Sequence, residues 1–204
     1  MELTGITLPG YRVFDYLLVL NPHEELWSRI MKIKEEFAST YQADQAKWGR
    51  PQLILASFLQ YELMEERISN RLQLIGMAQP PFKVELKEYG SFPSHTIYIN
   101  VASRLPIQQL VKNIRSDAQR LMKLNDDNKP HFILEPHITI AGKLKPWQYE
   151  KAWLEYSNRS FTGRFIADHM LLLKRPASEK KYQLVKKYVF QNMPVTTRQG
   201  ELFG

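Results

Sequence analysis

The segment EPHITIA, residues 135–141, has the same pattern as an earlier segment, RPQLILA, residues 50–56. The proline and the final alanine are identical, apolar residues occupy matching positions, and residue 137 follows residue 52 by 85 positions. Alternation of apolar and other side chains predicts a half-buried β-strand. A supersecondary unit repeated at this distance indicates a duplicated lobe.

The rest of the chain alternates between strand and helix patterns. A strand is expected over residues 14–20, and Asn21-Pro22 after it is a predicted helix start, with Asn21 as cap and Pro22 in the first turn. Helical spacing is found over residues 26–37, 64–75, 106–121 and 146–156. Further strands are expected over residues 50–58, 82–86, 95–101, 136–141, 161–174 and 182–190, with residues 174–181 as the turn of the last hairpin.

Two pairs of these strands follow each other directly, which disfavours a doubly wound parallel sheet. We therefore predict an α+β fold of two pseudo-twofold-related lobes. Each lobe has an antiparallel-rich sheet with helices on its outer side, and the two lobes enclose a central groove. Residues 1–193 are assigned to this single bilobal domain, and residues 194–204 to a polar C-terminal tail.

Composition removes several classes of chemistry. The 204 residues include no cysteine, which excludes thiol nucleophiles, disulfides and cysteine-bound zinc or iron–sulfur clusters. No signal peptide and no apolar run of about 18 residues is found, so we expect a cytoplasmic protein without membrane contact. With 28 Lys+Arg against 21 Asp+Glu, the net charge of +7 favours an anionic partner such as RNA or a nucleotide, or serves only solubility.

The two copies of the repeat differ in their reactive side chains. Residues i and i+2 of a strand share a face, so His137 and Thr139 point the same way. An imidazole beside a hydroxyl can exchange a proton and donate hydrogen bonds to a phosphoryl oxygen. The matching face of the first copy carries Gln52, which does not titrate, and Ile54, which has no donor.

The motif PHITIAGKL (136–144), the opening YLLVLNPHEEL (16–26) and the order of elements resemble the 2H phosphoesterases, the group that includes the bacterial 2′-5′ RNA ligases. This resemblance covers roughly residues 12–190. It implies a His-x-Thr/Ser motif in each lobe, facing each other across the groove. It also implies metal-independent cleavage or joining of 2′,3′-cyclic or 2′-5′ phosphodiesters. One histidine acts as base, the other as acid, and the hydroxyl residues hold the phosphate.

By this resemblance, His137 and Thr139 are the expected catalytic residues, and Gln52 and Ile54 stand where the first motif has His and Thr or Ser. Gln52 and Lys143 are expected to bind substrate. Lys143 shares the His137 face if the strand continues past Gly142, and is otherwise a solvated lysine at a strand end. The other histidines, His95, His131, His23 and His169, are weaker candidates for the missing partner, with His95 first among them.

The sequence thus predicts a 2H-phosphoesterase-like protein that acts on or recognises a nucleotide or RNA-end phosphodiester. Turnover should be weak or absent, because general acid–base catalysis by one group is worth roughly 10²–10⁴-fold. The alternative is a non-catalytic module that binds RNA or nucleotides. No cofactor or metal site is expected from the residue spacing, and we expect a monomer.

Overall fold

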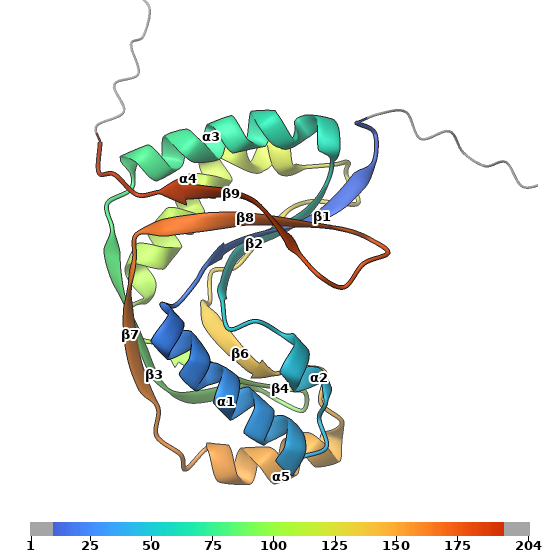
Figure 1. Cartoon of the computed structure of the whole chain (residues 1–204), viewed down its shortest axis with the longest axis vertical. Coiled ribbons are helices and arrows are strands. Elements are labelled where there is room, and N and C mark those ends of the chain that lie inside the picture. Colours follow the sequence, from blue (N-terminus) through green and yellow to red (C-terminus); the bar gives the residue numbers. More distant parts are fainter. Residues whose placement is uncertain (1–9, 194–204) are drawn as a thin grey trace, which may run out of the picture.

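The computed structural model describes residues 10–193 and contains two antiparallel sheets with helices packed on them (Figure 1). The predicted α+β architecture of two lobes is confirmed. The expected C-terminal tail, residues 194–204, lies outside the described residues. No helix among the described residues is long and apolar enough to cross a membrane.

The first sheet has five strands in the order β5-β2-β1-β8-β9, and all neighbours are antiparallel. Helices α3 and α4 pack against each other, and they contact β9 and β2, respectively (Figure 1). The elements of this lobe are β1 (Val13–Leu20), β2 (Leu53–Tyr61), the 3₁₀ turn η1 (Glu62–Met64), α3 (Glu65–Ala78), α4 (Arg104–Met122), β5 (His131–Phe132), β8 (His169–Pro176) and β9 (Gln183–Val189).

The second sheet has four antiparallel strands in the order β6-β4-β3-β7. Helix α1 contacts β6 and β7, the short α2 contacts β6, and α5 contacts β4. The elements of this lobe are α1 (Glu24–Thr40), α2 (Gln45–Trp48), β3 (Phe82–Phe92), β4 (Thr96–Val101), β6 (His137–Ala141), α5 (Pro146–Tyr156) and β7 (Thr162–Ala167).

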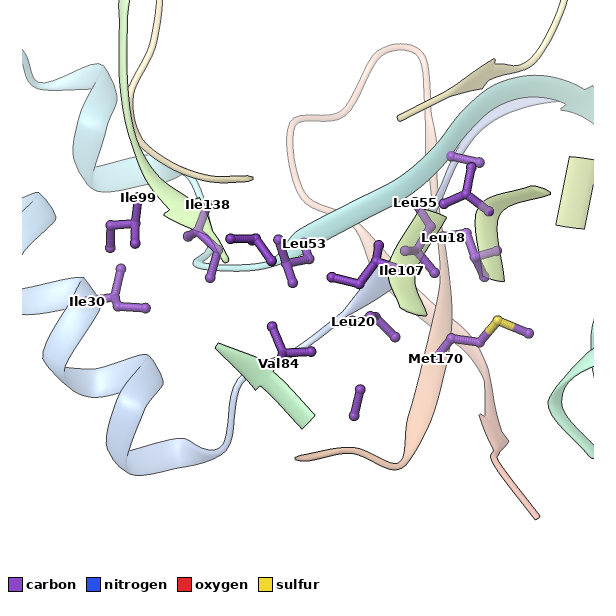
Figure 2. Close-up of a cluster of buried hydrophobic side chains, with 14 of the residues drawn as sticks. Leu18, Leu20, Ile30, Leu53, Leu55, Val84, Ile99, Ile107, Ile138 and Met170 are labelled. Carbon is purple, nitrogen blue, oxygen red and sulfur yellow. The ribbon is translucent and has the colours of Figure 1, made fainter. Parts of the chain in front are cut away.

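The two lobes are interlocked by their helices. Helix α1 follows β1 of the first sheet but packs on the second, and α4 follows β4 of the second sheet but packs on the first. Ile30 and Ile107, from these two helices, are fully buried in one core cluster that contains residues of both sheets (Figure 2). Because burial of apolar surface is the dominant favourable term in folding, this shared core joins the lobes into one domain.

The internal repeat is visible in the strand register. In the first sheet, Leu18 pairs with Ala56 and Val19 with Ile54, which leaves Leu55 as a β-bulge. In the second sheet, the pairing of β4 with β6 skips Ile140 in the same way. Residues 55 and 140 are separated by the same 85 positions as the sequence repeat. A bulge at the same place in both copies supports a common origin of the two strand pairs.

Three predicted boundaries are wrong. The cap of α1 is His23 and not Asn21, since the backbone N–H of Leu26 donates to His23 Nδ1 at 3.1 Å. Asn21 and Pro22 both precede the helix, which begins at Glu24, so the side chain next to its first free N–H groups is that of His23. The segment 161–174 is two strands, β7 and β8, because the chain passes from the second sheet to the first at Asp168.

The third correction concerns β2, which begins at Leu53, so Gln52 lies immediately before the strand. The predicted start at residue 50 placed too much of the preceding loop in the strand. A turn does join β8 and β9 between Pro176 and Gln183, as expected. Three short elements, α2, η1 and β5, were missed because runs of two to four residues have no measurable periodicity.

Candidate functional site

The half-buried His137 is the first residue of β6, and its ring is held from two sides. Its Nδ1 lies 2.8 Å from the carbonyl oxygen of Glu135. A carbonyl can only accept, so Nδ1 is the donor in this bond and Nε2 is the nitrogen that it leaves available. The rings of Phe92 and Tyr98 pack against the imidazole at centroid distances of 5.1 and 4.8 Å. His137 is therefore pre-oriented, with Nε2 as its free nitrogen.

Thr139 stands on the same face of β6 as His137. The alternating burial of the strand places Ile138 and Ile140 in the core and leaves the other two side chains half-buried. Across the strand pair, Thr139 lies opposite Tyr98 and His137 opposite Asn100. This face thus presents an imidazole, a hydroxyl, a phenol and an amide together, all of which can hydrogen-bond an anionic or polar ligand.

Tyr98 is part of this surface and the sequence analysis missed it. Burial, together with the nearby charge of Glu135, raises the pKa of the Tyr98 phenol above its usual value. Tyr98 therefore acts as a neutral donor at physiological pH. Its ring covers Gly90, where a Cβ would come within 2.6 Å of the ring, so only glycine fits there. The alternation of Thr96, Tyr98 and Asn100 with isoleucines was the signal that could have found this face.

The equivalent face of the first lobe is apolar. Ile54 packs against a separate small cluster that contains the buried Leu17, Val19 and Leu173. Gln52 is half-buried at the start of β2. The half-buried aliphatic side chain at position 54 is thus matched by the apolar side chains around it.

The two motif strands meet at their N-terminal ends. Strand β5 pairs with the middle of β2, and the backbone N–H of Ile133 donates to the carbonyl of Leu55 at 3.0 Å. After β5 the chain runs antiparallel to β2, toward the N-terminal end of β2, and reaches the start of β6 at His137. Strands β2 and β6 are in contact. Leu53 and Ile138, the residues after Gln52 and His137, are both buried in the same core cluster and are labelled in Figure 2.

Each motif residue also has an asparagine on or just after the neighbouring strand. Asn100 pairs with His137 directly. Leu20 pairs with Leu53, so Asn21 follows opposite Gln52. The side-chain oxygen of Asn21 is buried and has no hydrogen-bond partner among the described residues. Because buried polar groups are normally paired, this acceptor beside the altered motif is one that a donor on residue 52 could satisfy.

The remaining histidines are engaged elsewhere. His95 lies in the turn before β4, and its Nδ1 is 2.7 Å from Thr96 Oγ1. His131 is exposed in β5, and His23 caps α1. His169 begins β8 and its Nδ1 is bonded to the carboxylate of Asp168. None of these histidines has a described hydrogen bond to His137.

Lys143 does not meet the condition set for it. Strand β6 ends at Ala141, and Lys143 adopts a left-handed backbone conformation with φ of 54° and an exposed side chain. The bulge at Ile140 further breaks the simple alternation of faces. The parity argument that placed Lys143 beside His137 therefore does not apply.

A cavity of about 890 Å³ lies away from these residues. It is formed by the first half of α1 together with β3 and β7, and its lining includes Arg29, Lys32 and Arg164. None of His137, Thr139, Gln52 and Ile54 lines it. Among residues 10–193, no three His, Asp or Glu side chains gather closely enough to hold a metal ion.

Comparison with known proteins now identifies the family. The model of the 2′-5′ RNA ligase superfamily matches residues 22–179, so the chain belongs to this superfamily. The resemblance to the 2H phosphoesterases is thus confirmed. No curated protein matches the sequence.

Solved structures share the fold at low sequence identity. E. coli LigT complexed with 3′-AMP superposes with a TM-score of 0.60 at 17% identity, covering 88% of this chain and 99% of LigT. LigT complexed with phosphate gives 0.55 at 17% identity, with coverage of 88% and 98%. TT0787 of Thermus thermophilus gives 0.61 at 16% identity, with coverage of 87% and 98%. These matches show the two-lobed fold.

Proposed function

We propose that the chain binds a nucleotide or RNA-end phosphodiester, of the 2′,3′-cyclic or 2′-5′ type, with His137 and Thr139 as its central contacts. The carrying observation is that two like-built strands, β2 and β6, meet end to end while only β6 has a histidine and a hydroxyl on its exposed face. The LigT structures with 3′-AMP and with phosphate support a ligand of this class.

The chemistry expected at such a site needs two proton-transfer groups. Hydrolysis of a cyclic phosphodiester requires a base that takes the proton of the attacking water and an acid that protonates the departing ribose oxygen. Nε2 of His137 supplies one of these roles, and Thr139 donates to a phosphoryl oxygen. Gln52 offers only a neutral amide, so turnover by the wild-type protein is expected near background.

The alternative function is a non-catalytic binder of RNA or nucleotides. It is favoured by the packing of Ile54, which joins the apolar cluster of Leu17, Val19 and Leu173. A lobe that has replaced a phosphate donor with a packed aliphatic side chain keeps the fold and loses one ligand contact. The two alternatives differ in turnover and share the binding site on β6.

The test is a paired measurement of binding and turnover. Titration calorimetry with 2′,3′-cyclic AMP, and with a short RNA at two salt concentrations, gives affinity; chromatography gives hydrolysis of the cyclic nucleotide and of a 2′-5′-linked dinucleotide. His137→Ala should lower the affinity about tenfold or more. His131→Ala, which removes an exposed histidine of β5, is the matched control and should change nothing.

One outcome would overturn the proposal, and a second would overturn only the expected lack of turnover. Unchanged affinity in His137→Ala would show that any RNA binding uses the basic surface elsewhere. Rapid turnover that depends on His137 would instead show that another residue replaces the missing histidine, and His95→Ala would then be the next variant to measure.

A further inference from the structure

Lys34 is buried where an apolar residue is expected. Helix α1 packs Ile30 and Phe37 into the core, and Lys34 lies between them at helical spacing with only 2% of its surface exposed. A buried ammonium is costly unless it is paired. No carboxylate among the described residues forms a salt bridge with it.

The ammonium of Lys34 is instead bound to the backbone of the motif strand. Its Nζ donates to the carbonyl oxygen of Thr139 at 2.9 Å and to that of Ile140 at 2.7 Å. Ile140 is the bulged residue of β6, and Thr139 is the residue just before it. A Cβ placed on Gly49 would lie 3.5 Å from Nζ, so the segment before β2 closes over the ammonium.

The need for this lysine follows from the position of β6 in its sheet. β6 is the edge strand of the second sheet, so no further strand satisfies its outer carbonyls. In the first sheet, the bulge carbonyl of Leu55 accepts from the backbone N–H of Ile133. Lys34 therefore does in the second lobe what a backbone N–H does in the first, with the difference that it brings a positive charge.

We propose, on the basis of the proposed function, that Lys34 is a positioning residue for the phosphodiester site: it fixes the bulge that aims Thr139 and His137, and its charge strengthens the binding of the anion. The charge lies one hydrogen bond from the backbone of Thr139, in a region from which water is excluded. Electrostatic interactions are stronger there than in bulk water. The site thus receives a cation from behind the strand as well as donors from its exposed face.

The protonation state of Lys34 supports this role. Burial lowers the pKa of Lys34 to about 8, so the group is charged at neutral pH and loses its charge just above. The other charged or titratable groups on the elements packed against α1 are His137 on β6, Arg164 on β7, the Lys47–Asp44 pair at α2, and Arg50 before β2. Of these groups, only His137 belongs to the proposed phosphodiester site.

The test compares Lys34→Met, Lys34→Gln and Lys34→Arg with Lys32→Met, which removes an exposed lysine from the same helix. Affinity for 2′,3′-cyclic AMP, whose charge is constant from about pH 6 to 9, is measured by calorimetry across that range. Amide hydrogen exchange of residues 138–141 is measured without ligand. Circular dichroism checks folding, and Lys34→Gln, which keeps N–H donors, serves if Lys34→Met does not fold.

We expect Lys34→Met and Lys34→Gln to bind about tenfold more weakly at pH 7, and Lys34→Arg and Lys32→Met to stay within about twofold. Wild-type affinity should fall as the pH rises through about 8, and Lys34→Arg should lose this step. Exchange at residues 138–141 should accelerate in Lys34→Met, less in Lys34→Gln, and not in Lys32→Met.

The proposal is overturned if the neutral variants fold, bind as wild type and show unchanged exchange. If the wild type does not bind the cyclic nucleotide, or His137→Ala binds equally well, the proposed function fails instead. In that case the exchange data alone decide whether Lys34 fixes the bulge, and unchanged exchange in Lys34→Gln refutes it.

Discussion

Strands β2 and β6 share the same pairing pattern but carry different side chains on the matching face. Both pair antiparallel with a strand that comes earlier in the chain, both have a bulge at the equivalent residue, and both begin beside an asparagine. The exposed face of β6 carries His137 and Thr139, whereas that of β2 carries Ile54 within an apolar cluster. The backbone register is common to both copies while their side chains differ, which teaches that strand geometry and surface chemistry are specified by different residues of the same strand.

The largest expected effect comes from making the two copies alike. Gln52→His with Ile54→Thr places a histidine and a hydroxyl on the matching face of β2. We expect hydrolysis of 2′,3′-cyclic nucleotides to rise about 10²–10⁴-fold above background, because one general acid–base group is worth this much. Chromatographic assay of the product measures the gain.

The control for this gain is the triple variant that also carries His137→Ala, which should return to background. A folded double variant without activity would mean that the first lobe has lost more than two side chains. Gln52→His alone should give a smaller gain, since it restores the proton transfer without the phosphate donor.

The buried side chains at the starts of β2 and β6 should contribute about equally to the free energy of unfolding. Leu53 and Ile138 are fully buried in the same core cluster (Figure 2). Truncation of either to alanine should lower the free energy of unfolding by about 3 kcal/mol, from lost burial and the cavity left behind. Urea unfolding followed by circular dichroism measures it; a loss below about 1 kcal/mol in one variant would show that the two starts are packed differently.

Lys34 should make stability depend on pH in one lobe only. Its pKa is lowered from 10.5 to about 8 in the folded protein. Between these values the unfolded chain binds the proton and the folded chain does not, so stability rises with pH by up to about 1.4 kcal/mol per unit. Below about pH 8 both states are charged and the slope vanishes.

Urea unfolding at about pH 7.5, 8.5 and 9.5 tests this, with Lys34→Met as reference. The wild type should gain stability relative to Lys34→Met over this range. Equal slopes in the two proteins would show that Lys34 keeps an ordinary pKa in spite of its burial.

The smallest effects are expected from exchanging the two faces. Ile54→Thr alone should destabilise by about 1 kcal/mol, because a hydroxyl enters a partly buried apolar cluster. Thr139→Ile should change stability by less than about 0.5 kcal/mol at its half-buried position, yet weaken nucleotide binding. Thermal unfolding gives the first comparison and calorimetry the second; a large loss of stability in Thr139→Ile would indicate that Thr139 is needed for the fold.

Much of the fold was predictable because its signals are local. The alternation of PHITIA, the helical spacing of residues 106–121 and the proline-marked repeat each depend on neighbours in the chain. His137 and Thr139 were predicted from the same short motif. The helix cap at His23 and the split of residues 161–174 were not, because a chain that leaves one sheet for the other does so without a change in its apolar pattern.

The sequence by itself determined the α+β class, the repeated strand pattern and the difference in side chains between its two copies, since each is recorded in the order and type of consecutive residues. Only the tertiary structure decided that Tyr98 and Phe92 hold the His137 ring, that the bulges are equivalent, and that Lys34 reaches the carbonyls of Thr139 and Ile140. Lys34 and Thr139 are 105 residues apart, and although the helical spacing of Lys34 places it on the core face of its helix, nothing local shows which groups it binds. Lys34 binds carbonyls of β6, which lacks a neighbouring strand on one side. Which carbonyls are left without a strand partner is decided only when the sheet has assembled.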